Sequence, residues 1–249
     1  MKKIDHGKGK QRIFSLDEPN SLHTEMYRQI RTNIEYSSID RDIKVLNVTS
    51  TNANEAKTTT ACNLAVLSAN KNKRVLLMDL DLRNPSIHRL FKIKNYNGVT
   101  DILIDFTKYG DKLDITKYIQ LIKHPNIINE LFVLTSGTDT VSPFEILNSK
   151  RLSKLIEIFK EYFDEIIIDS APSGILADGV VTSKLADGTI FVIESGKNKI
   201  EMTQKVISQL SNIGVNILGI VLTKLPNKIR NYGSYYGKYY TNKTSQERI

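Results

Sequence analysis

A lysine followed by three threonines, residues 57–60, has the side chains and the setting to bind phosphate. An apolar strand pattern at 43–49 precedes it, small polar residues fill 49–56, and a helix pattern follows. This order is typical of a P-loop, whose backbone N–H groups and helix N-terminus face an anion. The lysine then reaches the β- and γ-phosphates of a nucleotide, and the next hydroxyl holds Mg²⁺. We predict that the nucleotide is bound by Asn54, Glu55, Ala56, Lys57, Thr58 and Thr59.

The loop lacks the glycines of the general pattern G-x-x-x-x-G-K-[ST]. Asn54 and Ala56 stand three positions and one position before the lysine, and no glycine occurs between Val48 and Lys57. Glycine serves in such loops because the backbone turns with positive φ and approaches the phosphate closely. Asparagine enters the left-handed region at modest cost, whereas alanine would lose roughly 1–2 kcal/mol there. The loop by itself leaves two interpretations open, a nucleotide site or a threonine-rich helix start.

Two further apolar strands end in carboxylates. RVLLMDLDLR places Asp79 and Asp81 at the end of one strand, with Arg83 just beyond, and EIIIDSAP places Asp169 at the end of another. If both strands flank the P-loop strand, these acids converge on the phosphate site. Mg²⁺ is commonly held there by one or two carboxylates and by phosphate oxygens. Asp169 is then a Walker-B-type residue, while Asp79 and Asp81 supply a base and a further metal contact. Each acid alone could instead cap a helix.

Alternating strands and helices must position these side chains. Strand candidates are nearly continuous Val/Ile/Leu runs at 43–49, 74–79, 131–135, 165–169, 188–194 and 215–223. Helix candidates lie at 20–37, 57–71, 143–162, 177–185 and 199–213, with a short one near 99–105. Continuous apolar strands are expected where helices cover both faces of a parallel sheet. We predict an α/β fold of the P-loop NTPase type, a mostly parallel sheet with helices on both faces and ligands at the carboxyl ends of its strands.

Composition and charge narrow the class of protein. The chain has 249 residues, 40% hydrophobic and 25% charged, which is ordinary for a globular protein. No apolar run approaches the ~20 residues that span a bilayer, and the basic N-terminus lacks a signal-peptide core, so we expect a cytoplasmic protein. The net charge of +8 suits anionic lipid or an acidic partner, or reflects solvated lysines. We expect three parts: a flexible N-terminus at 1–18, one domain at 19–225 and a flexible tyrosine-rich tail at 226–249.

The helix candidate at 20–37 has two distinct faces. Its apolar stripe recurs every four residues, at Leu22, Met26, Ile30 and Ile34. Glu25, Arg28 and Arg31 are spaced by three and share another face. That charged face is either an ordinary solvated surface or a salt-bridged contact with another copy of the chain.

Four segments together resemble the bacterial tyrosine kinases of capsule and exopolysaccharide operons (BY-kinases). They are Thr49-Ser50 with Lys57-Thr58-Thr59, LLMDLDLRNPSIHRLF, EIIIDSAPS and SLHTEMYRQIRTNI, and the resemblance covers roughly residues 20–240. The Asp-x-Asp-x-Arg-x-Pro block that starts at Asp79 matches the family's Walker A′ motif. The chain departs from the family at the loop glycines, at Ala171, where a proline is usual, and at Thr223-Lys224, where Asn-Lys is usual.

The resemblance implies an ATP-dependent protein-tyrosine kinase that phosphorylates itself and regulates polysaccharide biosynthesis. Its catalytic residues would be Lys57, Asp79 and Asp81, with Asp79 as the base for the tyrosine hydroxyl, and Thr58, Asp81 and Asp169 would hold Mg²⁺. The family's motif for ring-like self-association corresponds to Glu25, Arg28, Arg31 and Asn33. The partners implied are a membrane adaptor that recruits the kinase to the inner face of the membrane, a cognate tyrosine phosphatase and further copies of the chain. No nucleic acid is expected.

Five tyrosines gather near the C-terminus, at Tyr232, Tyr235, Tyr236, Tyr239 and Tyr240. Glycines and lysines separate them, so they form no apolar face, and we predict an exposed cluster of phosphoacceptors. A flexible linker of 8–16 residues from Lys224 spans roughly 15–24 Å, which favours phosphorylation between chains. Each phosphate adds about −1.5 to −2 charge, so phosphorylated tails would repel one another and favour monomers over a ring.

Two other functions remain open from the sequence. The missing loop glycines suit a degenerate scaffold or phosphorylation substrate that binds nucleotide weakly. A partitioning or cell-division ATPase of the same broader class usually carries an extra lysine five positions before the P-loop lysine. Asn52 occupies that position here, and the tyrosine cluster would then have no explanation.

Overall fold

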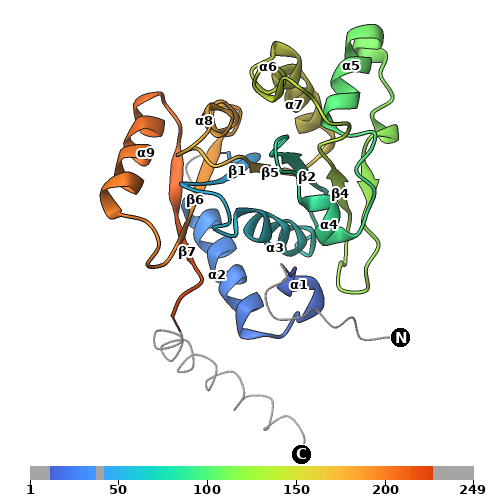
Figure 1. The fold of residues 1–249 in the computed structure, drawn as a ribbon. Helices are drawn as coiled ribbons and strands as arrows, with labels where there is room; N and C mark the ends of the chain where they lie inside the picture. The colour runs from blue at the N-terminus through green and yellow to red at the C-terminus, as the bar shows by residue number, and fades with distance from the viewer. Residues whose placement is uncertain (1–11, 38–41, 227–249) are drawn as a thin grey trace, which may run out of the picture.

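The computed structural model describes residues 12–37 and 42–226 (Figure 1). Its strands are β1 (Val45–Ser50), β2 (Val75–Leu80), β3 (Gln120–Leu121), β4 (Leu131–Leu134), β5 (Glu165–Ser170), β6 (Gly188–Glu194) and β7 (Ile217–Thr223). Its helices are α1 (Phe14–Asp17), α2 (Leu22–Ser37), α3 (Lys57–Ala69), α4 (Ile87–Phe91), α5 (Val99–Tyr109), α6 (Pro143–Leu147), α7 (Lys150–Tyr162), α8 (Ala177–Ser183) and α9 (Ile200–Asn212). Two 3-10 helices lie at Gly110–Lys112 and Ile115–Lys117.

The described strands form one seven-stranded sheet in the order β3-β4-β2-β5-β1-β6-β7. Every pairing is parallel except that of β3 with β4. Strand β5 lies between β1 and β2, and its register places Asp169 beside both Val48 and Asp79. The P-loop strand and the two acid-bearing strands are therefore neighbours, and their carboxyl ends meet at one edge of the sheet.

Alternate residues of the central strands pack into two hydrophobic layers. Leu46, Leu77 and Ile167 face a cluster with α1 and α3, against which α2 packs. Their neighbours Val45 and Ile166 face a cluster with α5, α6 and α7. Helices thus cover both faces, as Figure 1 shows, and the α/β P-loop class expected from the continuous apolar runs is confirmed. Burial on both faces explains why those strands show no alternation of polar and apolar residues.

Three expectations differ from the structure. The helix expected at 143–162 is two helices, because Ser149 caps α7 by accepting the Leu152 N–H at 3.2 Å. The last part of the segment expected to be flexible, 1–18, is folded: the Ser15 N–H donates to Asn63 Oδ1 at 2.9 Å, and Leu16 is buried against α3. The short helix expected near 99–105 continues to residue 109.

Some expectations cannot be compared with described structure. Residues 1–11 and the tail tyrosines 232, 235, 236, 239 and 240 lie outside the described residues, so those parts of the domain division stay predictions. Within the described ranges, no helix is long and apolar enough to cross a membrane.

Candidate active site

The loop between β1 and α3 adopts the backbone that the glycine pattern would require. Asn54 has φ 64° and Ala56 has φ 69°, so both lie in the left-handed region, and Ala56 immediately precedes α3. The cost expected for alanine in this region, roughly 1–2 kcal/mol, is therefore present in the folded protein. Positive φ at these two positions is thus reached without glycine.

Contacts from distant segments hold this strained loop. The Glu55 side chain is fully buried, and its carboxylate accepts hydrogen bonds from the Asn52 N–H at 2.8 Å and from the Asn198 side-chain amide. The Thr223 hydroxyl donates to the Glu55 carbonyl at 2.9 Å, and Lys224 Nζ donates to the Asn54 carbonyl at 2.7 Å. The Glu55 carboxylate, predicted to belong to the nucleotide site, thus supports the loop from within the protein.

Lys57, the first residue of α3, lies among the strand-end acids. Its ammonium is 2.6 Å from Asp81 Oδ2 and 3.6 Å from Asp169 Oδ1. Burial opposes the charge of Lys57, but the carboxylates of Asp169 and Asp81 outweigh it and raise the lysine pKa. The structure therefore brings together the lysine and the acids that the sequence placed at three separate strand ends.

Asp79, at the end of β2, is fully buried, and only one of its two carboxylate oxygens accepts hydrogen bonds. Its Oδ2 accepts the N–H groups of Ser86 and Ile87, each at 3.0 Å, whereas Oδ1 has no hydrogen-bond partner within the described chain. Burial, followed by the nearby Asp169 carboxylate, raises the pKa of Asp79 to about 8, although the Ile87 N–H and Lys57 oppose the shift. A carboxylate with so high a pKa is a suitable proton acceptor near neutral pH.

Asp169, at the end of β5, has the least support of the three acids. Both of its oxygens are buried, and no described residue lies within 3.5 Å of them in hydrogen-bonding geometry. Lys57 is at the ion-pair distance of 3.6 Å, and Lys57 and the Thr58 hydroxyl favour the charged form of Asp169 from this longer range. Burial raises the pKa of Asp169 to about 6, and the Lys57 charge limits the rise. A cation beside these buried oxygens would stabilise their charged form.

These oxygen donors fit a hard divalent cation. Asp169 supplies two unpartnered oxygens, and the Thr58 hydroxyl lies at the same strand ends, 3.0 Å from the Ser86 hydroxyl. Among the described residues, no three His, Cys, Asp or Glu side chains form a metal cluster of their own. Mg²⁺ usually takes one or two protein carboxylates and completes its shell with phosphate oxygens and water, and the oxygens of Asp169 and Thr58 suit such a shell.

Sequence reasoning missed several residues that support the site. Asn198 holds the P-loop, Ser86 contacts both Asp79 and Thr58, and Asp178 pairs with Arg83. Asn198 and Asp178 are far along the chain from their partners, so no local pattern marks them. Ser86 directly follows the Walker A′ block, and only its contacts distinguish it from its neighbours.

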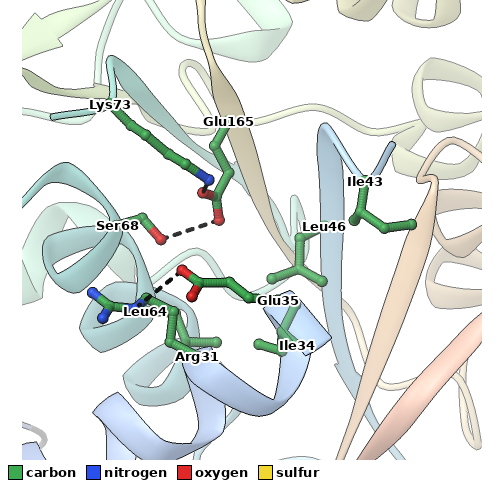
Figure 2. A pocket seen from close by; sticks show the side chains of 9 residues that line it. All are labelled: Arg31, Ile34, Glu35, Ile43, Leu46, Leu64, Ser68, Lys73 and Glu165. Atoms are coloured by element: carbon green, nitrogen blue, oxygen red, sulfur yellow. Dashed lines mark hydrogen bonds and ion pairs between the residues drawn. The ribbon is translucent and has the colours of Figure 1, made fainter. Parts of the chain in front are cut away.

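The four residues predicted for self-association do not share one surface. Arg28 pairs with Glu25 at 2.9 Å on the exposed side of α2. Arg31, expected on the same face, turns inward, where it donates to the Leu67 carbonyl at 2.6 Å and lies 3.6 Å from Glu35 (Figure 2). Asn33 lines a separate groove between α2 and β7. Helix α2 packs Arg31 against α3, and this packing overrides the spacing of three.

Comparison with known proteins assigns the family. Residues 46–241 match the CobQ/CobB/MinD/ParA nucleotide binding domain. The chain is 37% identical to the tyrosine-protein kinase YwqD of Bacillus subtilis over 90% of its length and 91% of that protein. It is 36% identical to the tyrosine-protein kinase CpsD of Streptococcus pneumoniae, over 86% and 91%.

A solved structure agrees with these sequence relatives. The chimerical protein CapA2B2 superposes with a TM-score of 0.77 at 28% identity, covering 86% of this chain and 90% of that one. Whole-domain coverage excludes a match limited to the P-loop, which unrelated nucleotide-binding proteins would share. The chain therefore carries a nucleotide-binding domain and belongs to the bacterial tyrosine-protein kinase family.

Proposed function

We propose that this kinase transfers the γ-phosphate of ATP to tyrosine hydroxyls, first on the C-terminal cluster of a neighbouring copy, and thereby regulates capsular or exopolysaccharide biosynthesis. The observation that carries the proposal is the buried group of Lys57, Asp79, Asp81 and Asp169 beside a loop that has positive φ at residues 54 and 56. Phosphoryl transfer needs little covalent chemistry from a protein and depends on positioning and charge.

Each side chain has a role that its surroundings support. Lys57 would bind the β- and γ-phosphates, leaving the two carboxylates that now neutralise it. Mg²⁺, held by Thr58, Asp81 and Asp169, would supply charge neutralisation of the transferring group. The tyrosine oxygen forms a bond to the γ-phosphorus as the bond to the β-phosphate oxygen breaks, and the phenolic proton passes to Asp79. A buried base can take such a proton through one bridging water.

The acceptor and the partners follow from the relatives and from the chain itself. Relatives bear names such as a putative tyrosine-protein kinase in the cps region of Klebsiella pneumoniae. The five tail tyrosines begin eight residues after Lys224, within flexible reach of a neighbouring site. A membrane adaptor would complete the site at the inner face of the membrane, and a tyrosine phosphatase would reverse the reaction. The unmodified chains would assemble as a ring and separate after phosphorylation.

The scaffold alternative depends on the missing loop glycines. Their loss was expected to weaken nucleotide binding, yet Asn54 and Ala56 both adopt the positive φ that glycine would supply. The observed backbone favours an active kinase over a scaffold.

Phosphorylation of the full chain tests the proposal. The protein would be incubated with ATP, Mg²⁺ and the adaptor's cytoplasmic segment, and phosphotyrosine mapped by mass spectrometry. We expect phosphate on tyrosines 232–240, and calorimetry should show micromolar ATP affinity. Absence of phosphotyrosine with measurable ATP binding would contradict kinase activity, and absence of both would favour the scaffold.

A further inference from the structure

The turn that follows β2 supports several side chains of the site. This acid turn comprises residues 81–86. The Asn84 N–H donates to Asp81 Oδ1 at 3.1 Å, and the Ser86 N–H donates to Asp79 Oδ2 at 3.0 Å. The Ser86 hydroxyl also lies 3.0 Å from the Thr58 hydroxyl. The position of one short turn therefore sets the surroundings of Asp79, Asp81 and Thr58.

A two-point ion pair ties the middle of this turn to α8. Arg83 Nε donates to Asp178 Oδ2 at 2.6 Å, and Nη2 donates to Oδ1 at 3.2 Å. The Asp178 side chain is 3% exposed, whereas that of Arg83 is 45% exposed. Two parallel bonds to a buried carboxylate fix the orientation of a guanidinium, which a solvated surface pair does not do.

Asp178 is itself held on a rigid frame. Helix α8 packs so closely on the loop after β5 that a Cβ on Gly179 would lie 2.3 Å from the Ala171 carbonyl oxygen. That carbonyl accepts the Thr49 hydroxyl at 2.9 Å, and Thr49 belongs to β1, the P-loop strand. The carboxylate of Asp178 is therefore fixed relative to β1 and β5, and Arg83 extends this restraint to the acid turn.

We propose that Asp178 is a positioning residue of the kinase site, which holds Arg83 and thereby keeps the acid turn in the geometry that presents Asp79, Asp81 and Thr58. This inference rests on the proposed roles of Asp79 and Asp81 in phosphoryl transfer. Asp178 acts through Arg83 and the turn and needs no contact with the nucleotide or the tyrosine.

Amide hydrogen exchange tests the restraint without any turnover. In Asp178→Asn, the full chain should exchange the amides of Asn84, Ser86 and Ile87 about tenfold faster than the parent, while the amides of β2 keep their protection. Glu145→Gln is the matched control, because this exposed acid of α6 also acts on the charge of Arg83 but makes no hydrogen bond to it. Unchanged exchange of those three amides in Asp178→Asn would overturn the proposal.

Kinetics test whether the restraint serves the reaction. The Ser86 and Ile87 N–H groups stabilise the charged form of Asp79, which also faces Asp169, Lys57 and Asp81. A loosened turn should lower kcat about tenfold. It should leave the KM for ATP within about twofold, because the loop at 49–56 keeps its own contacts with Asn198 and Thr223. A purely structural role, acting on the whole fold, would change kcat and KM together.

Variants of Arg83, the partner of Asp178, complete the test and control for misfolding of Asp178→Asn. Arg83→Gln, at a half-exposed position, should reproduce both effects, Arg83→Lys should retain part of the activity, and the double variant should equal either single one. Additive losses would contradict action through a shared bond. If the parent transfers no phosphate, the proposed function fails, while the exchange measurement still decides the role of Asp178.

Discussion

Strand β5 begins with one carboxylate, Glu165, and carries another, Asp169, one residue before its end, and the two have opposite environments. At its first residue, Glu165 has both oxygens bonded, one to the Ser68 hydroxyl at 3.1 Å and one to Lys73 at 2.8 Å (Figure 2). Near the other end, Asp169 is fully buried, has no described partner within 3.5 Å in hydrogen-bonding geometry, and has Lys57 at 3.6 Å.

The difference distinguishes a structural ion pair from a binding site. A carboxylate with both oxygens satisfied stabilises the fold and offers nothing to a ligand. A buried carboxylate without hydrogen bonds costs folding free energy, and it persists where a function needs it. Lysine–carboxylate pairs occur at both ends of the strand, so hydrogen-bond satisfaction and not the presence of charge identifies the site.

Replacing the lysine at each end should give the largest contrast. Lys57→Met should reduce tyrosine phosphorylation about 10³-fold, because it removes the charge that binds the transferring phosphate. Lys73→Met, its counterpart at the amino end, should leave the rate within about twofold of the parent. Phosphotyrosine formation with ATP and Mg²⁺ measures both. Equal losses in the two variants would remove the distinction between the ends.

Replacing the two acids should separate ATP binding from stability: one variant should lose binding and the other should lose stability. Asp169→Asn should weaken Mg²⁺-dependent ATP binding about 10–100-fold. It should leave the thermal stability of the nucleotide-free protein unchanged or higher, because a costly buried charge is lost. Glu165→Gln should lower the free energy of unfolding by about 1 kcal/mol and leave ATP binding unchanged. Calorimetry and thermal unfolding give the two values for each variant, and a destabilised Asp169→Asn would speak against the interpretation.

The pH dependence of stability should come from the carboxyl end. The folded-state pKa values of Asp79, about 8, and Asp169, about 6, lie above the usual value of 3.8. The folded state therefore binds more protons than the unfolded state from about pH 4 to pH 8, and the free energy of unfolding should fall as pH rises through that range.

Variants locate the source of that dependence. Asp79→Asn should flatten most of the slope in denaturant unfolding measured from pH 5 to 8.5, whereas Glu165→Gln should keep the slope of the parent. Stability that instead rises with pH in the parent would mean that the buried acids are charged at less cost than their surroundings indicate.

The smallest effect should come from relieving the P-loop. Ala56→Gly removes a left-handed alanine, and after the greater chain entropy of glycine is subtracted, the free energy of unfolding should rise by about 0.5–1 kcal/mol. Asn54→Gly should change it less, because asparagine already tolerates positive φ. Ala65→Gly, inside helix α3, is the control and should lower stability by about 1 kcal/mol. An Ala56→Gly variant no more stable than the parent would show that the contacts of Glu55 fully absorb the strain.

The sequence predicted the elements and the location of the site because both depend on local patterns. Continuous apolar runs follow from strands buried on both faces, and an acid after such a run lies at a strand's carboxyl end. The convergence of Lys57, Asp79 and Asp169 therefore needed only the correct strand order. The break at Ser149 was missed, because the apolar helical period continues from α6 into α7 across the break.

By itself, the sequence determined the class of fold, the edge of the sheet that carries the site, and the residue types available there, since hydrophobic periodicity and strand-end chemistry are local. Only the tertiary structure decided that Ala56 adopts a left-handed backbone conformation, in a loop fixed by the contact of Glu55 with Asn198. It also decided that Arg31 packs inward and that Asp178 binds Arg83. These contacts join residues 36 to 143 positions apart. Which distant residues become partners depends on how whole helices and strands pack, and the hydrophobic periodicity of the sequence does not indicate it.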